Sequence, residues 1–255
     1  MPNSKLSAGG VDDAARLRVI SGAADQPTRA VISALELPTA SRVLDIGAGN
    51  GSVAWWMAAD AFPGGQVVAL DTDTTLLEAE PLPGNCAVVR ADIAEYACDP
   101  DTFDLVHARF VLSHLADRDR ICATVVQWLR PGGYFVVTEP FSLGTCSLYP
   151  AVNEVLGAYE HYCQTTGFDL SWARRVPAVM QQSGARVVDV RTSAGRLGGG
   201  PGVDRWDPLI RRVADDLVGA GLDAGTLDRF FALCADRDVY DVPQVIVTVV
   251  GRRPD

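Results

Sequence analysis

Lysine is nearly absent from this chain, and acidic residues outnumber basic ones. Lys5 is the single lysine, and 22 lysine and arginine residues stand against 32 aspartate and glutamate residues, which gives a formal net charge of −10. Nucleic-acid binding needs a basic surface that displaces the counterions of the phosphate backbone. We therefore expect no nucleic-acid partner.

Long apolar runs are missing as well. No segment approaches the roughly 18 consecutive apolar residues of a membrane-spanning helix, and the first residues, Met-Pro-Asn-Ser-Lys, lack the features of a secretion signal. The six cysteines include no C-x-x-C pair, and no histidine lies at metal-ligand spacing from them. Such cysteines are typical of free thiols in a reducing compartment. We expect a cytoplasmic protein with no membrane association and no zinc site.

The chain does contain enough apolar residues for one large core. Of its 255 residues, 48% are hydrophobic, which suits a single domain with insertions. Between residues 42 and 140, apolar β-prone segments alternate with helix-prone segments. This alternation predicts a parallel sheet with helices on both faces, and ligands at the carboxyl ends of its strands.

The segment 43–52, Val-Leu-Asp-Ile-Gly-Ala-Gly-Asn-Gly-Ser, predicts a strand, a glycine turn and the start of a helix. Gly47 and Gly49 allow the backbone to approach a ligand closely. A dinucleotide-binding loop has the spacing G-x-G-x-x-G, whereas Ser52 stands at the third glycine position here. Asp45, two residues before the first glycine, favours a cationic ligand over a pyrophosphate. Asp45 is a ligand-binding acid, a structural acid that caps the loop, or both.

Two further acids follow predicted strands. Asp71, with Thr72 beside it, comes at the end of an apolar strand, about twenty residues after the glycine loop, where a carboxylate can accept hydrogen bonds from two ribose hydroxyls. Asp92 and Ile93 follow the next strand. The acids therefore fall at neighbouring strand ends, as a nucleoside-binding edge requires.

The order of these segments resembles class I S-adenosylmethionine-dependent methyltransferases. The resemblance covers most of the chain and is specific through Pro140. It implies a Rossmann-like α/β fold, in which a seven-stranded, mostly parallel sheet has helices on both faces and its last strand lies antiparallel beside the sixth. It also implies helical insertions that form a lid over the substrate, S-adenosyl-L-methionine as cofactor and S-adenosyl-L-homocysteine as product.

The resemblance also assigns residues to the cofactor. Asp92 would accept a hydrogen bond from the adenine amino group, and Ile93 would pack on the ring. Ala108 would present its backbone to the methionyl part. Arg109 would pair with a carboxylate of cofactor or substrate, or form a structural ion pair. The predicted cofactor-binding residues are Asp45, Gly47, Ala48, Gly49, Asp71, Thr72, Asp92, Ile93, Ala108 and Arg109.

Two residues are candidates for a direct role in catalysis. His114, in the loop after the fourth strand, is best suited to take a proton near neutral pH, although a lone histidine is also a common structural residue. Glu139, at the end of the fifth strand, could orient a substrate hydroxyl or amine. Related methyltransferases that hold a metal carry acids in the loop of His114. This chain has Phe110 and Ser113 instead, so we expect no metal.

The sequence predicts one domain in three parts. Residues 1–40 form a helical lead with one helix from Asp12 to Ile20 and another from Gln26 to Leu37. Residues 41–140 form the cofactor-binding core, and 141–255 form the rest of the sheet with the lid, including a helix over 171–183. Within the last part, insertions at about 141–182 and 192–242 should hold the substrate. Some of their side chains are either an aromatic pocket or ordinary core: Tyr149, Tyr159, His161, Tyr162 and Trp172.

We expect a methyltransferase that acts on a small molecule such as a secondary metabolite. The sequence leaves open whether oxygen, nitrogen or carbon is methylated, and it leaves the oligomeric state open. Two alternatives remain, because a fold does not fix its chemistry. One is an enzyme of this fold that catalyses a cyclisation or isomerisation, and the other is a non-catalytic binding protein. A nicotinamide-dependent dehydrogenase is a further rival, which Asp45 and Ser52 oppose.

Overall fold

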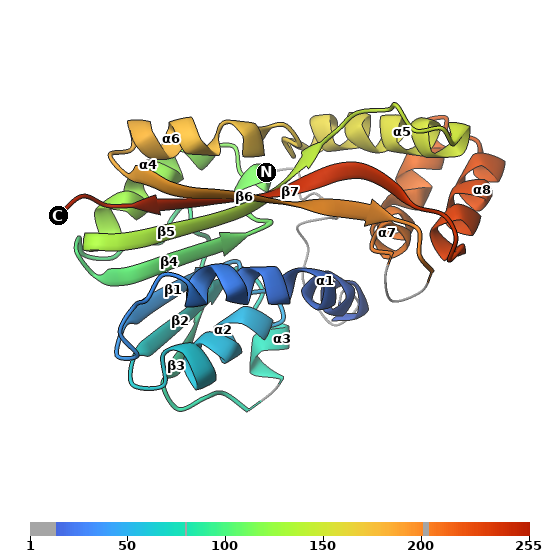
Figure 1. The fold of residues 1–255 in the computed structure, drawn as a ribbon. Coiled ribbons are helices and arrows are strands. Elements are labelled where there is room, and N and C mark those ends of the chain that lie inside the picture. The colour runs from blue at the N-terminus through green and yellow to red at the C-terminus, as the bar shows by residue number, and fades with distance from the viewer. Residues whose placement is uncertain (1–13, 80, 201–203) are drawn as a thin grey trace.

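A seven-stranded sheet with the order β3-β2-β1-β4-β5-β7-β6 crosses the molecule in the computed structural model, which describes residues 14–79, 81–200 and 204–255 (Figure 1). Strands β1 to β5 are parallel, and β7 runs antiparallel between β5 and β6. The predicted mostly parallel sheet with an antiparallel last strand is therefore confirmed. The strands are β1 Arg42–Ile46, β2 Gln66–Asp71, β3 Cys86–Arg90, β4 Phe103–Arg109, β5 Leu129–Ser142, β6 Arg186–Leu197 and β7 Asp241–Arg252.

Helices cover both faces of the sheet, as the alternation of segments predicted (Figure 1). Helices α1, α2 and α3 lie on one face, and α4 and α6 lie on the other. A π-helical turn over Met57–Ala61 continues α2. The helices on the sheet are α1 Ala14–Ser33, α2 Ser52–Trp56, α3 Thr75–Glu78, α4 Arg118–Trp128 and α6 Val176–Gln182.

Side chains of the central strands alternate between these two layers. Val43 of β1 and Leu105 of β4 pack in the core under α1 and α2, while Leu44 and Val106 pack in the core under α4 and α6. Successive side chains of a strand point to opposite faces. The polar residues Asp45 and His107 therefore point to the α1 side.

A second group of helices forms a separate apolar cluster at one end of the sheet, where β6 and β7 project beyond the other strands (Figure 1). These helices are α5 Pro150–Thr166, α7 Trp206–Gly219 and α8 Ala224–Ala235. Buried side chains from all three pack together, among them Val155, Ile210 and Phe230. Both expected insertions contribute to this cluster, which we call the helical cap.

Two local expectations differ from the structure. Two helices were expected before residue 40, but α1 is one continuous helix with Pro27 in its interior. Asp12, the expected start of the first helix, lies outside the described residues. The helix expected over 171–183 is divided into a 3-10 turn, Trp172–Arg174, and α6, with a proline in the first turn of α6. None of the helices in the described ranges is both long and apolar enough to span a membrane.

Candidate functional site

The glycine loop after β1 is tied to strand β2 through its backbone. The N–H groups of Gly47 and Ala48 both donate to the carbonyl of Leu70, at 2.8 and 3.1 Å. The N–H of Gly49 donates to Oδ2 of Asp71 at 2.8 Å. We expected these amides to meet the ligand, but the protein itself uses all three. The loop is thereby held rigidly at the carboxyl ends of β1 and β2.

The two predicted glycines serve different purposes. Both have positive φ, +67° at Gly47 and +59° at Gly49, which glycine adopts without strain. A Cβ at Gly47 would lie 2.2 Å from a methyl group of Val111, so this glycine permits close packing against the loop after β4. A Cβ at Gly49 would have no neighbour nearer than 3.9 Å. A side chain at Gly49 would therefore make only ordinary contacts with Leu17 and the carbonyl of Gly47, and the residue itself is partly exposed at the strand ends.

Asp71 occupies the end of β2 beside Gly49. Its Oδ1 accepts a hydrogen bond from the N–H of Asp73 at 3.1 Å, while Oδ2 holds Gly49. Burial raises the pKa of Asp71, and its backbone hydrogen bonds oppose that rise. Each oxygen keeps further acceptor capacity. Thr72, the next residue, is exposed at the same edge.

Asp92 and Ile93 follow β3 as predicted, with opposite exposure. Asp92 is exposed, and its Oδ1 accepts from the N–H of Ala94 at 2.9 Å, which fixes the turn. Ile93 is only 6% exposed and packs in the core with Leu70 and Ala108. Asp71 and Asp92 therefore stand at the carboxyl ends of adjacent strands, as the sequence indicated.

Asp45 is buried and paired with a histidine that we had not predicted. It lies opposite His107 in the register of β1 and β4, and its Oδ1 is 2.7 Å from Nδ1 of His107. The two side chains are 4% and 1% exposed. The structure shows the structural role, in which Oδ1 of Asp45 joins the two central strands beneath the glycine loop.

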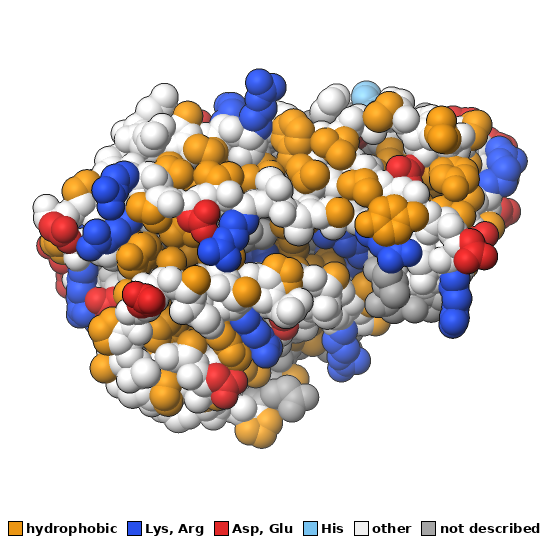
Figure 2. All heavy atoms as spheres, viewed as in Figure 1, with side chains coloured by type: hydrophobic (Ala, Val, Ile, Leu, Met, Phe, Trp, Pro, Cys, Tyr) orange, Lys and Arg blue, Asp and Glu red, His pale blue; other side chains and the backbone are white. Residues whose placement is uncertain are grey.

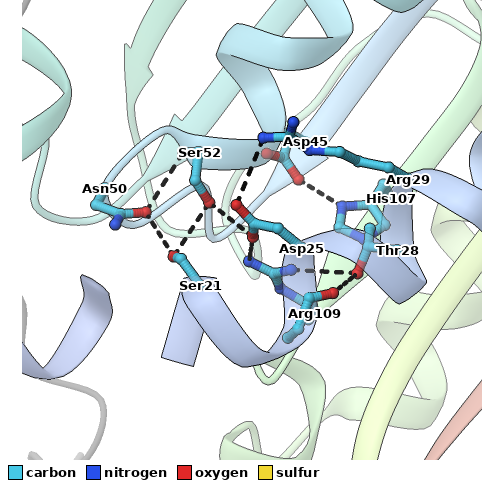
Figure 3. Close-up of polar contacts among 10 residues, drawn as sticks. Ser21, Asp25, Thr28, Arg29, Asp45, Asn50, Ser52, His107 and Arg109 are labelled. Carbon is cyan, nitrogen blue, oxygen red and sulfur yellow. Dashed lines mark hydrogen bonds and ion pairs between the residues drawn. The ribbon is translucent and has the colours of Figure 1, made fainter. Parts of the chain in front are cut away.

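Arg109, the last residue of β4, is directed to helix α1 (Figure 3). Its Nη2 is 2.9 Å from Oδ1 of Asp25, and its Nη1 donates to Oγ1 of Thr28 at 3.1 Å. Asp25 also accepts from Oγ of Ser52 at 3.0 Å. Arg109 thus forms the structural ion pair that was one of its two expected roles. Ala108, just before it, is fully buried.

The loop after β4 is organised around Glu139. The N–H groups of Val111, Leu112 and Ser113 donate to its Oε1 at 3.1, 2.8 and 3.3 Å, and Oγ of Ser113 donates to Oε2 at 2.6 Å. Glu139 is 0% exposed, and burial raises its pKa to about 7. The expected contact of Glu139 with a substrate is therefore not what the structure shows. Its carboxyl group holds the loop that carries His114.

His114 lies against the segment that follows α5. Its ring stacks on Phe168 with 3.9 Å between centroids. Burial lowers the pKa of His114 to about 4, and the positive charges of Arg16 and Arg118 act in the same direction. Its Nδ1 is buried without a hydrogen-bond partner. At neutral pH the side chain is an uncharged imidazole.

The aromatic residues of the insertions do not form one pocket. Trp172 is 0% exposed in the main core, where its Nε1 donates to Asp119 at 2.8 Å. Tyr159 is buried in the helical cap, edge-on to Trp206. His161 is exposed on the surface of α5. The alternative interpretation as ordinary core therefore holds for Trp172 and Tyr159.

Sequence reasoning missed the contributions of Asp25, Thr28 and His107. One signal for His107 was available, since Asp45 in β1 and His107 in β4 each interrupt a run of apolar residues. Two such residues in neighbouring central strands are expected to satisfy each other. Asp25 and Thr28 gave no comparable signal, because their partners lie more than 25 positions away in the chain.

Comparison with known proteins agrees with this arrangement. A family described as "Methyltransferase domain" matches residues 44–137, the segment from β1 to β5. The methyltransferase str3 of Strobilurus tenacellus is 34% identical over 110 residues, which is 42% of this chain and 38% of that protein. The chain thus spans well under two thirds of the length of the relatives it matches at this level of identity.

Two broader matches extend beyond the core. The methyltransferase GfsG of Streptomyces halstedii is 23% identical over 91% of this chain and 81% of its own length. The fold is similar to that of phosphoethanolamine N-methyltransferase 2 of Haemonchus contortus, with a TM-score of 0.58 and 20% identity over 90% of this chain and 53% of the other. The similarity in fold therefore includes the second half of the sheet.

Proposed function

We propose that the chain transfers a methyl group from S-adenosyl-L-methionine to a small molecule. Through residues 44–137 it belongs to the class I S-adenosylmethionine-dependent methyltransferase family. The observation that carries the proposal is the edge formed by Gly49, Asp71 and Asp92. These residues place a partly exposed glycine and two carboxylates at the ends of adjacent parallel strands. Ligands of open α/β sheets bind at this edge.

Each residue of this edge has a proposed part in holding the cofactor. The free acceptor capacity of Asp71 suits two ribose hydroxyls, and exposed Asp92 suits the adenine amino group. Gly49 has no side chain, so its backbone can lie directly against the ligand. Ile93 and Ala108 would form the apolar layer beneath the bound cofactor. Oδ1 of Asp45 is paired with His107, so we propose that Asp45 supports the loop and that its second oxygen is the one available to the amino end of the cofactor.

Methyl transfer requires chiefly alignment and the exclusion of water. The bound cofactor would supply an electrophilic methyl group, which the acceptor atom attacks in line. The loop after β4, fixed by Glu139 through four hydrogen bonds, sets one wall of the space beside the end of β4. The ion pair between Arg109 and Asp25 holds α1 over the other side.

His114 is the proposed acceptor of a proton when the substrate must lose one. Its pKa of about 4 leaves the ring uncharged at neutral pH and also makes it a weaker base than an ordinary histidine. We propose no metal in this step. Among the described residues, no group of three histidine, cysteine, aspartate or glutamate side chains is arranged to hold one.

A small-molecule acceptor is supported by the helical cap and by the relatives. The cap stands at the carboxyl edge of the sheet and can enclose a substrate against it. Relatives that match the core include trans-aconitate 2-methyltransferase of Variovorax paradoxus, named for a small acceptor. We also propose that the chain works in the cytoplasm, because its six unpaired cysteines are typical of a reducing compartment.

The test is a turnover assay with S-adenosyl-L-methionine and a panel of carboxylated, phosphorylated and neutral small molecules. Mass spectrometry should detect S-adenosyl-L-homocysteine together with a methylated product, in the presence and absence of a chelator. Chelation should leave the rate unchanged. Conversion of an acceptor without release of S-adenosyl-L-homocysteine would contradict methyl transfer and favour a cyclisation or isomerisation.

A further inference from the structure

A cavity lies between α1 and the projecting parts of β5, β6 and β7. Its volume is about 90 Å³, and its walls include Thr28, Thr138, Arg196, Arg205 and Thr248. A water molecule takes about 30 Å³ in the liquid, so the cavity suits one compact group of a few heavy atoms. In Figure 2, basic side chains lie recessed in the hollow on this side of the molecule.

Arg205 is the most unusual residue of this cavity. Its Nε and Nη2 are both buried without a hydrogen-bond partner. A Cβ at Gly195 would lie 2.5 Å from Nη2 of Arg205, which shows how tightly strand β6 packs against the guanidinium group. Burial lowers the pKa of Arg205 to about 10, which still leaves it charged at neutral pH. A buried cation with free donors is costly unless an anion meets it.

Arg196 adds a second cation to the same wall. Its Nε is also buried without a partner, and its guanidinium lies 4.3 Å from the centroid of the Tyr240 ring. Neither Arg196 nor Arg205 forms an ion pair with a carboxylate among the described residues. The nearby Asp204 accepts from the N–H groups of Gly198 and Asp207 instead.

The rest of the lining is neutral and combines hydroxyl groups with apolar side chains. Oγ1 of Thr138 and Oγ1 of Thr248 are 3.0 Å apart and share one hydrogen bond. Pro27, also in the wall, has no N–H and so leaves the carbonyl of Ala23 without its usual helical donor. No described carboxylate forms part of the wall. The guanidinium donors of Arg196 and Arg205 therefore face no negatively charged side chain in the wall of this cavity.

The cavity adjoins the place proposed for methyl transfer. Thr28, in its wall, accepts from Arg109 at the end of β4. Thr138, on the opposite wall, accepts through its carbonyl from the N–H of Phe110 at 2.9 Å. A group bound here would hold the remainder of a molecule at the carboxyl edge, between α1 and the helical cap.

We propose that Arg205 and Arg196 bind an anionic group of the methyl acceptor, a carboxylate or a phosphate, in this cavity. The proposal rests on the proposed function, since it makes the anion part of the acceptor. A guanidinium group matches both anions through paired N–H donors. The chain would thereby select acidic acceptors, although its own net charge is −10.

The experiment measures binding of two simple anions, inorganic phosphate and acetate, by calorimetry at constant ionic strength. The wild type and the variants Arg205→Gln, Arg196→Gln and Arg186→Gln are compared. Arg186 is the matched control, since it is exposed at the opposite end of β6. Each titration is run with and without saturating S-adenosyl-L-homocysteine. The affinity for S-adenosyl-L-homocysteine and the circular dichroism spectrum report the fold of each variant.

At least one anion should bind the wild type, and the tighter of the two identifies the group. Arg205→Gln and Arg196→Gln should each weaken that binding by roughly tenfold or more, while Arg186→Gln stays within about twofold. If Arg205→Gln does not fold, Arg196→Gln decides alone. Absence of anion binding to the wild type, or equal binding by the folded variants, would overturn the cavity assignment. If the wild type does not bind S-adenosyl-L-homocysteine, the proposed function is overturned. The anion titrations would then still decide whether Arg205 and Arg196 form an anion site.

Discussion

Arg109 at the end of β4 forms an ion pair with Asp25 in the middle of α1, with 2.9 Å between Nη2 and Oδ1. The two side chains are 10% and 18% exposed, so water screens the pair only weakly. Ser52, at the start of α2, donates to the same carboxylate oxygen. This pair therefore joins α1 to both β4 and the end of the glycine loop (Figure 3).

Asp25→Asn should lower the free energy of unfolding by about 1–3 kcal/mol, because it leaves the guanidinium of Arg109 without its anionic partner. Denaturant unfolding measures the change. Arg120→Gln is the control, since its ion pair with Asp117 is 59% and 58% exposed and should be worth less than about 1 kcal/mol. Equal stability of Asp25→Asn and the wild type would show that α1 is held by its apolar contacts alone.

Asp71→Ala should weaken the binding of S-adenosyl-L-homocysteine by roughly ten- to a hundredfold, which corresponds to about 1.5–3 kcal/mol for a carboxylate that holds two hydroxyls. Part of the loss would come from Gly49, which donates to Asp71. Calorimetry of the folded variant gives the affinity, and Asp189→Ala, which removes a half-exposed acid of β6 paired with Arg191, is the control. An affinity within twofold of the wild type would refute the role of Asp71.

Glu139 should make the stability of the protein depend on pH. Its folded pKa of about 7 lies above the ordinary 4.5, so between these values the folded state binds more protons than the unfolded state. The contribution of Glu139 is present below about pH 4.5 and is lost as the pH rises through about 7, an effect on the order of 3 kcal/mol. Glu139→Gln should remove this part of the profile.

Denaturant unfolding at several pH values from 5 to 8 measures the profile of Glu139→Gln against the wild type. Glu95→Gln, an exposed residue, should keep the slope of the wild type. If the slopes of all three proteins agree, the carboxyl group of Glu139 ionises as it does in the unfolded chain, and its assigned environment is wrong.

His114 should titrate near pH 4 in the folded protein. Because this value lies below the ordinary 6.5, its contribution to stability is present above about pH 6.5 and is lost as the pH falls through about 4. Proton NMR of the imidazole, assigned with His114→Gln, gives the midpoint directly. A midpoint at or above 6 would mean that the ring is not enclosed as the structure shows, and that it changes charge near neutral pH.

The fold was predictable because its signals are local. The glycine turn after β1, the acids after β2 and β3 and the alternation of strands and helices each depend on neighbouring residues. The pairing of Asp45 with His107 depends on strand register, which no local pattern states. Trp172 and Tyr159 show a further limit, since an apolar aromatic side chain at helical spacing suits a core and a pocket equally well. Arg205 gave no signal because its burial depends on residues that are distant in the sequence and pack around it only in the folded chain.

Calorimetric titration of the purified chain with S-adenosyl-L-homocysteine, and in parallel with NAD, tests the central claim most directly. The glycine loop, with Asp71 and Asp92 at neighbouring strand ends, predicts a single site for S-adenosyl-L-homocysteine and no detectable binding of NAD. S-adenosyl-L-methionine should compete for the same site. Binding of NAD without any binding of S-adenosyl-L-homocysteine would contradict the account.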